Sequence, residues 1–182
     1  WRTRKPQVTW WQRVSTGKGY SLRKFRVEAL PGLWIPGILY EPDQIRGLVP
    51  VVLNVNGHER KGKVTDYKQL RCINLAKRGM LALNLEWLGM GQLNLPGYAH
   101  NDLAKLDICG TSGLSVFFLA MSRGLDVLLS HPHADPSRVA VTGLSGGGWQ
   151  TIMLSSLDSR VTLTVPVAGY SALLQRLDQA NS

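Results

Sequence analysis

The segment 143–147, Gly-Leu-Ser-Gly-Gly, restricts the fold of this chain more than any other stretch of its sequence. It follows a short β-branched run, Val139–Thr142, and precedes an apolar helical pattern. A sharp strand-to-helix turn at this point forces a strained backbone at Ser145 and leaves no room for side chains two residues to either side. Gly143 and Gly147 meet this steric demand. The sequence therefore predicts a strand-turn-helix unit with Ser145 at its apex.

A serine at this apex is expected above the carboxyl ends of the strands, where open α/β sheets bind ligands. We therefore interpret Ser145 as a catalytic nucleophile. The alternatives for the segment are a glycine-rich turn without a nucleophile and a loop that holds phosphate. A phosphate loop is disfavoured because the lysine of a Walker loop is absent and the glycines do not form G-x-G-x-x-G.

Extended and helical patterns alternate along the rest of the chain. Two extended runs flank Pro31-Gly32 and predict an antiparallel hairpin, and the later apolar runs are typical of strands covered on both faces. The order predicts an α/β fold with a mixed, mostly parallel sheet and helices on both faces. The expected strands are 20–30, 33–40, 49–55, 80–85, 139–142 and 161–167, and the expected helices are 65–79, 114–128 and 146–157.

The length of 182 residues fits one domain. Residues 1–19 are expected to form an irregular N-terminal segment. Residues 20–182 are expected to form the N-terminal and central part of one domain. The short apolar strand at 139–142 is expected near the centre of the sheet.

A second motif, Asn56-Gly57-His58-Glu59, directly follows the apolar run that ends at Val55. Acyl transfer requires two backbone donors that point at the developing oxyanion. One candidate is the N–H of Gly146, the residue after the nucleophile. The other is the backbone N–H of His58, because the second donor comes from the loop after an earlier strand. The alternative is a plain turn that ends the strand.

The hairpin, the Asn-Gly-His loop, the turn 85–91 (Leu-Glu-Trp-Leu-Gly-Met-Gly) and the Gly-Leu-Ser-Gly-Gly segment follow the order of an α/β-hydrolase. Over roughly residues 12–182 the chain resembles the acetylxylan-esterase-like, or cephalosporin-deacetylase-like, branch of that superfamily, which has prolyl-oligopeptidase and dienelactone-hydrolase relatives. The resemblance implies a serine-dependent carboxylic-ester hydrolase that acts through an acyl-enzyme, with a small-molecule or carbohydrate ester, such as a xylan-type acetate, as substrate. Where the superfamily more often has His-Gly, this chain has Asn56-Gly57.

Such enzymes carry their triad in the order Ser, then Asp or Glu, then His. No histidine follows Ser145, and the acids after it are Asp158 and Asp178. Asp158 is expected at the far end of the helix that follows Ser145, and Asp178 lies beyond the last strand. We therefore expect that the catalytic acid and histidine are not in this chain, that the hydrolase fold is incomplete at its C-terminus, and that the chain alone is inactive.

The four histidines all precede Ser145. His131 and His133 are predicted on the surface, at the edge of the sheet opposite Ser145. His58 and His100 are predicted in loops on the same side as Ser145, where either is a less favoured alternative for the base.

Two other functions remain open for the chain. One is a prolyl-oligopeptidase-like serine peptidase, which would need a large β-propeller upstream. The other is a hydrolase-like pseudoenzyme or binding module that keeps the pocket without the triad. A downstream acid and histidine would separate the two enzymes from the pseudoenzyme.

The formal net charge of +9 is concentrated near the N-terminus, where eight basic residues precede the first acid, Glu28. We interpret these residues as a solvated flank, since no nucleic-acid motif accompanies them. We expect no membrane segment, because charges or glycines interrupt the apolar stretches before the length that a membrane helix needs. We expect no cofactor, and no metal because Cys72 and Cys109 match no metal-ligand spacing. Both cysteines are expected to be small buried residues. A secreted or periplasmic location is consistent with a signal upstream of Trp1.

Overall fold

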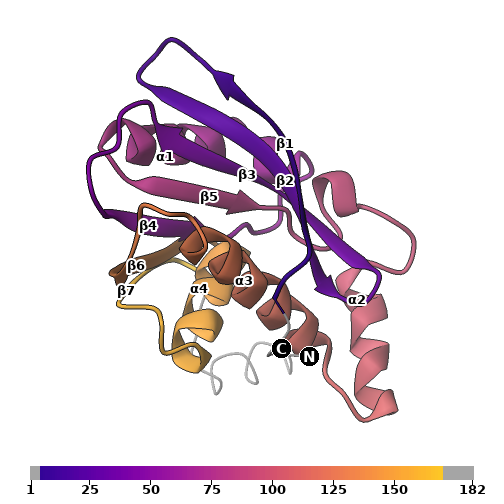
Figure 1. The fold of residues 1–182 in the computed structure, drawn as a ribbon. Helices are drawn as coiled ribbons and strands as arrows, with labels where there is room; N and C mark the ends of the chain where they lie inside the picture. The colour runs from indigo at the N-terminus through magenta and orange to yellow at the C-terminus, as the bar shows by residue number, and fades with distance from the viewer. Residues whose placement is uncertain (1–4, 170–182) are drawn as a thin grey trace.

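The computed structural model describes residues 5–169, whose strands form a single seven-stranded sheet. The strands are β1 (Val8–Ser15), β2 (Tyr20–Leu30), β3 (Leu33–Pro42), β4 (Val49–Asn54), β5 (Leu81–Leu85), β6 (Ala134–Leu144) and β7 (Leu163–Val167). Their order is β1-β2-β3-β5-β4-β6-β7 (Figure 1). Strands β5, β4, β6 and β7 are parallel, and β1, β2, β3 and β5 pair antiparallel. This mixed sheet confirms the predicted α/β fold and the predicted hairpin.

Helices cover both faces of the sheet (Figure 1). On one face, α1 (Asp66–Lys77) packs against β3 and β5. On the other face, α3 (Gly113–Leu129) packs against β2, β4 and β5, and α4 (Gly146–Leu157) packs against β6 and β7. The connections contain four shorter pieces: η1 (Gly62–Val64), η2 (Gly91–Leu93), α2 (His100–Leu103) and η3 (Ala104–Cys109).

The central strands divide their side chains between the two faces. Val51, Leu53 and Leu83 belong to the large core under α3, and Ala82 belongs to a smaller core that includes Cys72 of α1. This alternation explains the nearly continuous apolar runs, because a strand covered on both faces has no polar side.

The prediction of an irregular segment over residues 1–19 was wrong for Val8–Ser15, which forms strand β1 and pairs with β2. This stretch is rich in β-branched and aromatic residues, which favour strands. Trp10 packs on Phe25 of β2 with 4.9 Å between ring centroids. Apolar and polar residues alternate only weakly along this strand, and the charged residues near it make this alternation hard to recognise in the sequence.

Strand β6 differs from its predicted form in two ways. It begins at Ala134 rather than at Val139, because its first residues pair with the start of β4 before a register shift. It lies between β4 and β7, next to the edge of the described sheet and not near its centre.

His131 and His133 lie at the amino end of β6, opposite Ser145, as predicted. His131 was expected on the open surface, but its side chain is only 15% exposed and its Nε2 lies 3.1 Å from Oε1 of Glu41. His133 Nδ1 donates to the carbonyl of Gly47 over 2.9 Å.

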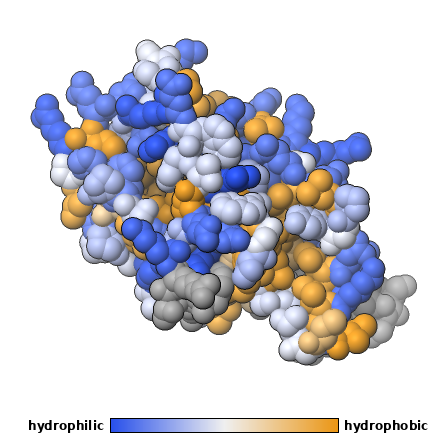
Figure 2. Space-filling view, turned by 45° about the vertical axis from the view of Figure 1, so that its right-hand side comes forward, coloured by the Kyte–Doolittle hydropathy of each residue, from blue (hydrophilic) through white to orange (hydrophobic). Residues whose placement is uncertain are grey.

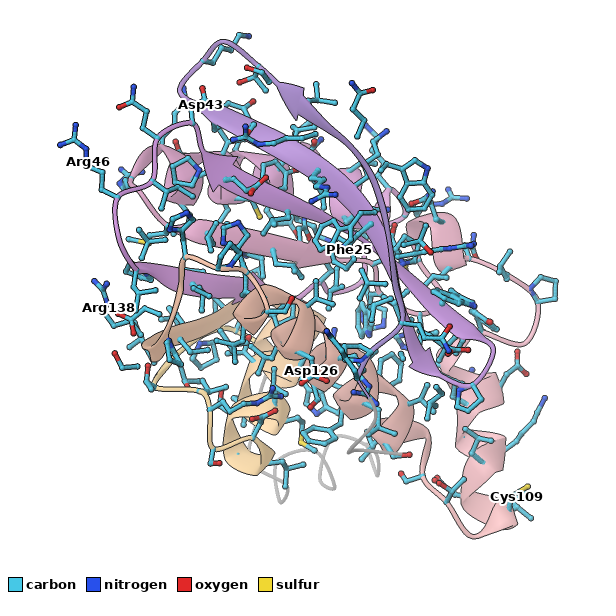
Figure 3. The ribbon with its side chains drawn as sticks, in the orientation of Figure 1. Phe25, Asp43, Arg46, Cys109, Asp126 and Arg138 are labelled. Carbon is cyan, nitrogen blue, oxygen red and sulfur yellow. The ribbon has the colours of Figure 1, made fainter. Side chains whose placement is uncertain are left out.

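Cys72 is buried as predicted, whereas the prediction for Cys109 was wrong. Cys109 is exposed at the outer end of η3, a segment without buried residues (Figure 3).

Some large apolar side chains are exposed on the described surface. Ile108, beside Cys109, is 88% exposed, and Leu163 of β7 is 58% exposed. Figure 2 shows apolar side chains gathered toward the lower right of the face in view, beside polar ones.

Within residues 5–169 no single helix is long and apolar enough to cross a membrane. The segments His100–Cys109 and Gly113–Leu129 meet the length and hydropathy requirement only together, across a bend of 109°.

Gly37 of β3 faces Phe25 across the β2–β3 pair, and a Cβ at this glycine would lie 2.5 Å from Cε1 of the Phe25 ring. We predict that Gly37→Ala lowers the free energy of unfolding by about 1–3 kcal/mol, because the ring must leave its position in a packed core. Urea unfolding measures this change. On a Phe25→Leu background the same substitution should cost less, since the obstructing ring is gone. An unchanged unfolding midpoint for Gly37→Ala alone would contradict the prediction.

Candidate active site

Ser145 occupies the sharp turn between β6 and α4, as the sequence predicts. Its φ is 57° and its ψ is −120°, and among residues 5–169 only Ala168 is another non-glycine residue with positive φ. Such a conformation costs on the order of 1–3 kcal/mol and persists only where the surroundings impose it. The Ser145 N–H donates to the carbonyl of Val167 over 2.9 Å, which fixes the turn against the end of β7.

The glycines around Ser145 are required by backbone contacts. A Cβ at Gly143 would lie 2.5 Å from the Gly147 carbonyl oxygen, and one at Gly147 would lie 2.6 Å from the Val55 carbonyl oxygen. Gly169, which the sequence did not single out, has a φ of 82° and lies against the carbonyl of Ser145. The serine therefore has backbone atoms packed around it and no space for a neighbouring side chain.

The loop after β4 lies directly on this turn. A Cβ at Gly57 would lie 2.8 Å from the Gly147 nitrogen, 2.8 Å from the Leu144 carbonyl oxygen and 2.9 Å from the Gly146 nitrogen. The contact follows from the topology, because β4 and β6 are parallel neighbours whose connections leave for opposite faces. In an open α/β sheet, the crevice at such a switch point binds ligands.

Buried polar groups hold the loop after β4 in place. The Asn56 side-chain amide donates to Oδ1 of Asn84 over 2.7 Å and to the Leu85 carbonyl. Gln150 of α4 donates to the Asn56 carbonyl. Sequence reasoning did not assign Asn84 or Gln150 to the site, although an asparagine inside an apolar strand run was an available signal.

The turn after β5 is anchored by Glu86, whose side chain is 1% exposed. Its carboxylate accepts hydrogen bonds from the Lys63 N–H over 2.8 Å and from Lys63 Nζ over 2.9 Å. A buried charge needs such a partner. The next residue, Trp87, packs against Gly146, since a Cβ at Gly146 would overlap the indole ring.

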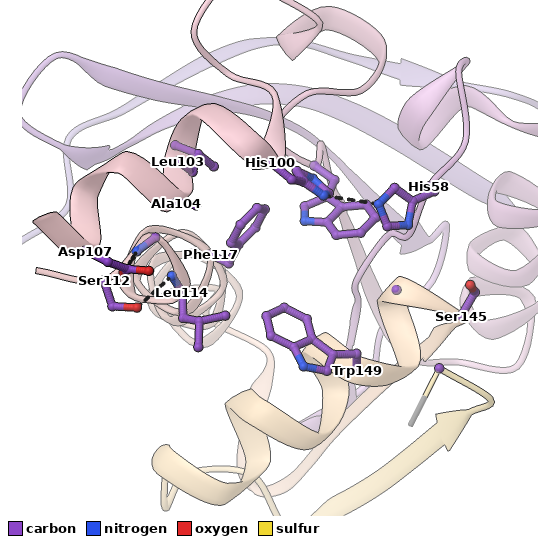
Figure 4. Close-up of a pocket in the computed structure, with 14 residues that line it drawn as sticks. His58, His100, Leu103, Ala104, Asp107, Ser112, Leu114, Phe117, Ser145 and Trp149 are labelled. Carbon is purple, nitrogen blue, oxygen red and sulfur yellow. Dashed lines mark hydrogen bonds between the residues drawn. The ribbon is translucent and has the colours of Figure 1, made fainter. Parts of the chain in front are cut away.

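Ser145 lines a pocket of about 500 Å³ (Figure 4). Its walls include Trp87, Phe117 and Trp149, with Phe117 edge-on to Trp149 at 6.2 Å between ring centroids. At the end away from Ser145, Asp107 and Ser112 accept hydrogen bonds from backbone N–H groups of the first turn of α3. The pocket therefore combines aromatic and aliphatic walls with a few polar groups, and the exposed Ser145 lies on its rim.

His58 and His100 meet in the same pocket (Figure 4). His100 Nε2 lies 3.1 Å from the Leu88 carbonyl oxygen, so this nitrogen donates a proton. In the neutral ring, Nδ1 of His100 is then an acceptor, and it lies 3.1 Å from Nε2 of His58, which must donate. His58 Nδ1 is left as the acceptor of the pair.

The pKa of His58 is lowered from its ordinary value of 6.5. Burial is the largest cause, followed by the nearby His100 and Lys68. The lowered pKa favours the neutral ring at pH 7, in agreement with its place in the hydrogen-bonded pair.

The structure thus brings Ser145, Gly146 and His58 to one pocket. Asp158 lies at the other end of α4, where it pairs with Arg160 over 2.7 Å and accepts from Ser122 over 3.2 Å. Asp178 lies outside the described residues. Within residues 5–169 no histidine nitrogen hydrogen-bonds the Ser145 hydroxyl. The same part of the chain holds no cluster of three or more His, Cys, Asp or Glu side chains that could bind a metal ion.

Comparison with known families gives a match over most of the chain. The model of the family described as acetyl xylan esterase (AXE1) matches residues 14–181. A search of curated proteins gave no match.

Several solved structures share the fold. Methylesterase BT1017 is 26% identical, with a TM-score of 0.79 over 91% of this chain and 36% of that chain. The acetyl xylan esterase from Paenibacillus sp. R4 is 25% identical, with a TM-score of 0.73 over 96% of this chain and 57% of that chain. Acetyl xylan esterase 1 from Thermoanaerobacterium sp. JW/SL YS485, 17% identical with a TM-score of 0.73 over 88% and 51% of the two chains, is similar in fold alone. The chain spans between 36% and 57% of the length of these structures.

We predict that His58 titrates below 6.5 because its ring is partly buried beside His100 and Lys68. NMR titration of the imidazole C–H protons measures this midpoint. His100→Ala should raise it toward the ordinary value, because the substitution removes a neighbouring imidazole and opens the site to water. Lys105→Met, which removes an exposed charge from η3, should leave it unchanged. A midpoint at or above 6.5 in the unsubstituted protein would exclude this environment.

Proposed function

The chain belongs to the acetyl xylan esterase family, and we propose from this that the pocket lined by Ser145 is the acyl-transfer site of a serine-dependent carboxylic-ester hydrolase. The observation that carries the proposal is Ser145 in a strained, glycine-flanked turn on the rim of that pocket. A backbone strained at one exposed serine is typical of a nucleophile elbow.

In this proposal Ser145 Oγ attacks the ester carbonyl carbon and its proton passes to a general base. The carbonyl oxygen becomes an oxyanion, which accepts hydrogen bonds from the backbone N–H groups of Gly146 and His58. The alcohol then leaves with a proton, and water hydrolyses the acyl-enzyme to release the acid. The packing of Gly57 on the Gly146 nitrogen supports this pairing, since it puts the two donor segments in contact.

We further propose that the base and its acid are supplied from outside residues 1–182. No histidine follows Ser145 in residues 146–182. The two histidines in the pocket bond to each other and to the Leu88 carbonyl, and within residues 5–169 neither hydrogen-bonds the Ser145 hydroxyl. A serine hydroxyl without a base is a poor nucleophile at neutral pH.

The pocket walls favour an ester of a carbohydrate. The half-buried ring of Trp149 offers a flat apolar surface on which a sugar ring can stack, and the buried rings of Trp87 and Phe117 form the wall around it. Two ester types fit this chemistry. In an acetylated sugar the acyl group on Ser145 is small and the sugar leaves as the alcohol. In a methyl ester of a sugar acid, which the name of the methylesterase relative brings into consideration, the sugar itself forms the acyl-enzyme.

We predict that Ser145→Ala in the complete protein lowers ester turnover by several orders of magnitude without loss of folding. Initial rates on an acetylated xylooligosaccharide and on a methyl uronate measure the effect and separate the two ester types. Ser156→Ala, an exposed serine on the same helix, is the matched control and should keep full activity. Retention of more than about a tenth of the activity in Ser145→Ala would exclude the nucleophile role. Peptide cleavage without ester cleavage would favour the peptidase, and neither activity the pseudoenzyme.

Residues 1–182 alone are expected to give no Ser145-dependent turnover of an activated acetate ester, because in this proposal the base comes from outside them. The control is the complete protein under the same conditions. Turnover by the chain alone would show that His58 or His100 supplies the base, and His58→Gln and His100→Gln would then identify which.

A further inference from the structure

Lys68 of α1 is buried without a counter-ion at hydrogen-bond distance. Its residue is 1% exposed, and within residues 5–169 its Nζ hydrogen-bonds the Gly57 carbonyl oxygen over 3.4 Å and forms no ion pair within 4 Å. The other buried lysine, Lys63, has the carboxylate of Glu86 at 2.9 Å. The ring centroid of Tyr67 lies 5.9 Å from the same Nζ. A buried ammonium whose hydrogen-bond acceptor is a neutral carbonyl costs stability, which suggests that Lys68 is kept for function.

The partner of Lys68 belongs to the peptide that carries the proposed oxyanion donor. The peptide bond between Gly57 and His58 is trans, since residues 5–169 contain no cis peptide. In a planar trans peptide the C=O and the N–H point in opposite directions. Because the Gly57 carbonyl points to Lys68, the His58 N–H points away from α1.

The side of this peptide that faces away from α1 is the side of the Ser145 turn. Gly57 packs directly on the turn of Ser145, with the Gly146 and Gly147 nitrogens within 3 Å of the place a Cβ would take. The side chain of His58 lines the same pocket as Ser145. The His58 N–H therefore belongs to the residue directly after Gly57, which itself contacts the turn of Ser145.

We propose that Lys68 is a positioning residue, whose ammonium holds the Gly57 carbonyl so that the N–H of His58 faces the acyl group on Ser145. This role rests on the proposed function. It deepens that function by assigning a buried cation on the opposite face of the sheet from α4 to the oxyanion site.

A fixed peptide is needed here because glycine is conformationally permissive. Gly57 can adopt backbone angles closed to other residues, so the Gly57–His58 peptide can rotate at low cost. A rotated peptide would turn its carbonyl oxygen, and not its N–H, toward the oxyanion. The positive charge of Lys68 opposes this rotation, since it attracts the carbonyl oxygen, and it polarises the peptide so that the N–H is a stronger donor.

The charge on Lys68 depends on pH within an accessible range. Burial lowers its pKa to about 8, while Glu59 and Glu86 raise it and Arg71 lowers it. The charge on Lys68 in turn lowers the pKa of His58, and the Tyr67 ring lies 5.9 Å from Nζ. The ammonium is present below about pH 8 and is lost as the pH rises through that value. A neutral amine holds the carbonyl more weakly, so turnover should fall on the alkaline side.

The test compares Lys68→Met, Lys68→Gln and Lys77→Met in the complete protein. Methionine keeps the length of the side chain without a donor, and glutamine keeps a neutral donor. Lys77 is an exposed lysine on the same helix. We expect kcat to fall about tenfold or more in Lys68→Met with KM within about twofold, because the oxyanion exists only in the transition state. The kcat of Lys68→Gln should fall less than that of Lys68→Met. Neither Lys68 variant should show the decline of turnover near pH 8, and Lys77→Met should have the kcat, KM and pH profile of the unsubstituted protein.

The outcomes separate this inference from the proposed function. An unsubstituted protein without Ser145-dependent ester turnover would overturn the proposed function. An active protein in which Lys68→Met keeps its kcat, or raises KM with kcat unchanged, would overturn the role of Lys68 alone. If Lys68→Met does not fold, the decision rests on Lys68→Gln and on the pH profile of the unsubstituted protein. A profile that stays flat from pH 7 to 10 would then refute the positioning role.

Discussion

The direct contact of backbone on backbone around Ser145 is the constraint on which the rest of the site depends. The ends of β4, β6 and β7 meet there with no side chains between them, because Gly57, Gly143, Gly147 and Gly169 leave only main-chain atoms. The strained φ of Ser145 is held by this packing and by the hydrogen bond to Val167. The sheet provides the necessary rigidity, since three neighbouring parallel strands end at the same edge of the sheet.

Buried polar groups beneath the loops fix the orientation of the peptides that the glycines allow to pack closely. Apolar packing excludes water but does not orient a peptide, whereas a hydrogen bond to its carbonyl does. Gln150 from one face of the sheet and Lys68 from the other hold successive carbonyls, those of Asn56 and Gly57. The two helices on opposite faces thus act on one loop, which explains why a site at the end of the sheet needs both layers.

The sequence predicts the local parts of this arrangement well and the remote parts poorly. The hairpin, the buried strands β4 and β5 and the turn at Ser145 are each specified by neighbouring residues, and the structure has them where expected. Strand β6 begins earlier than predicted and lies off the centre of the described sheet, because its neighbours are set by the topology. Strand β1 was missed because its alternation of apolar and polar residues is weak, although its β-branched and aromatic residues favour a strand and its pairing with β2 stabilises it. The contacts of Lys68 and Gln150 join residues 11 and 94 positions apart, and no short pattern reports them.

The buried pair of Lys63 and Glu86 has a consequence for how this family can vary. Gly62 and Gly91 approach the same carboxylate so closely that a Cβ at either would overlap it. Substitution of Lys63 or Glu86 alone leaves the other charge buried without its partner. Substitution of Gly62 or Gly91 alone places a side chain against the Glu86 carboxylate. The four are therefore expected to co-vary in homologues, as either the intact set or a joint replacement, and a lone change should be rare in evolution.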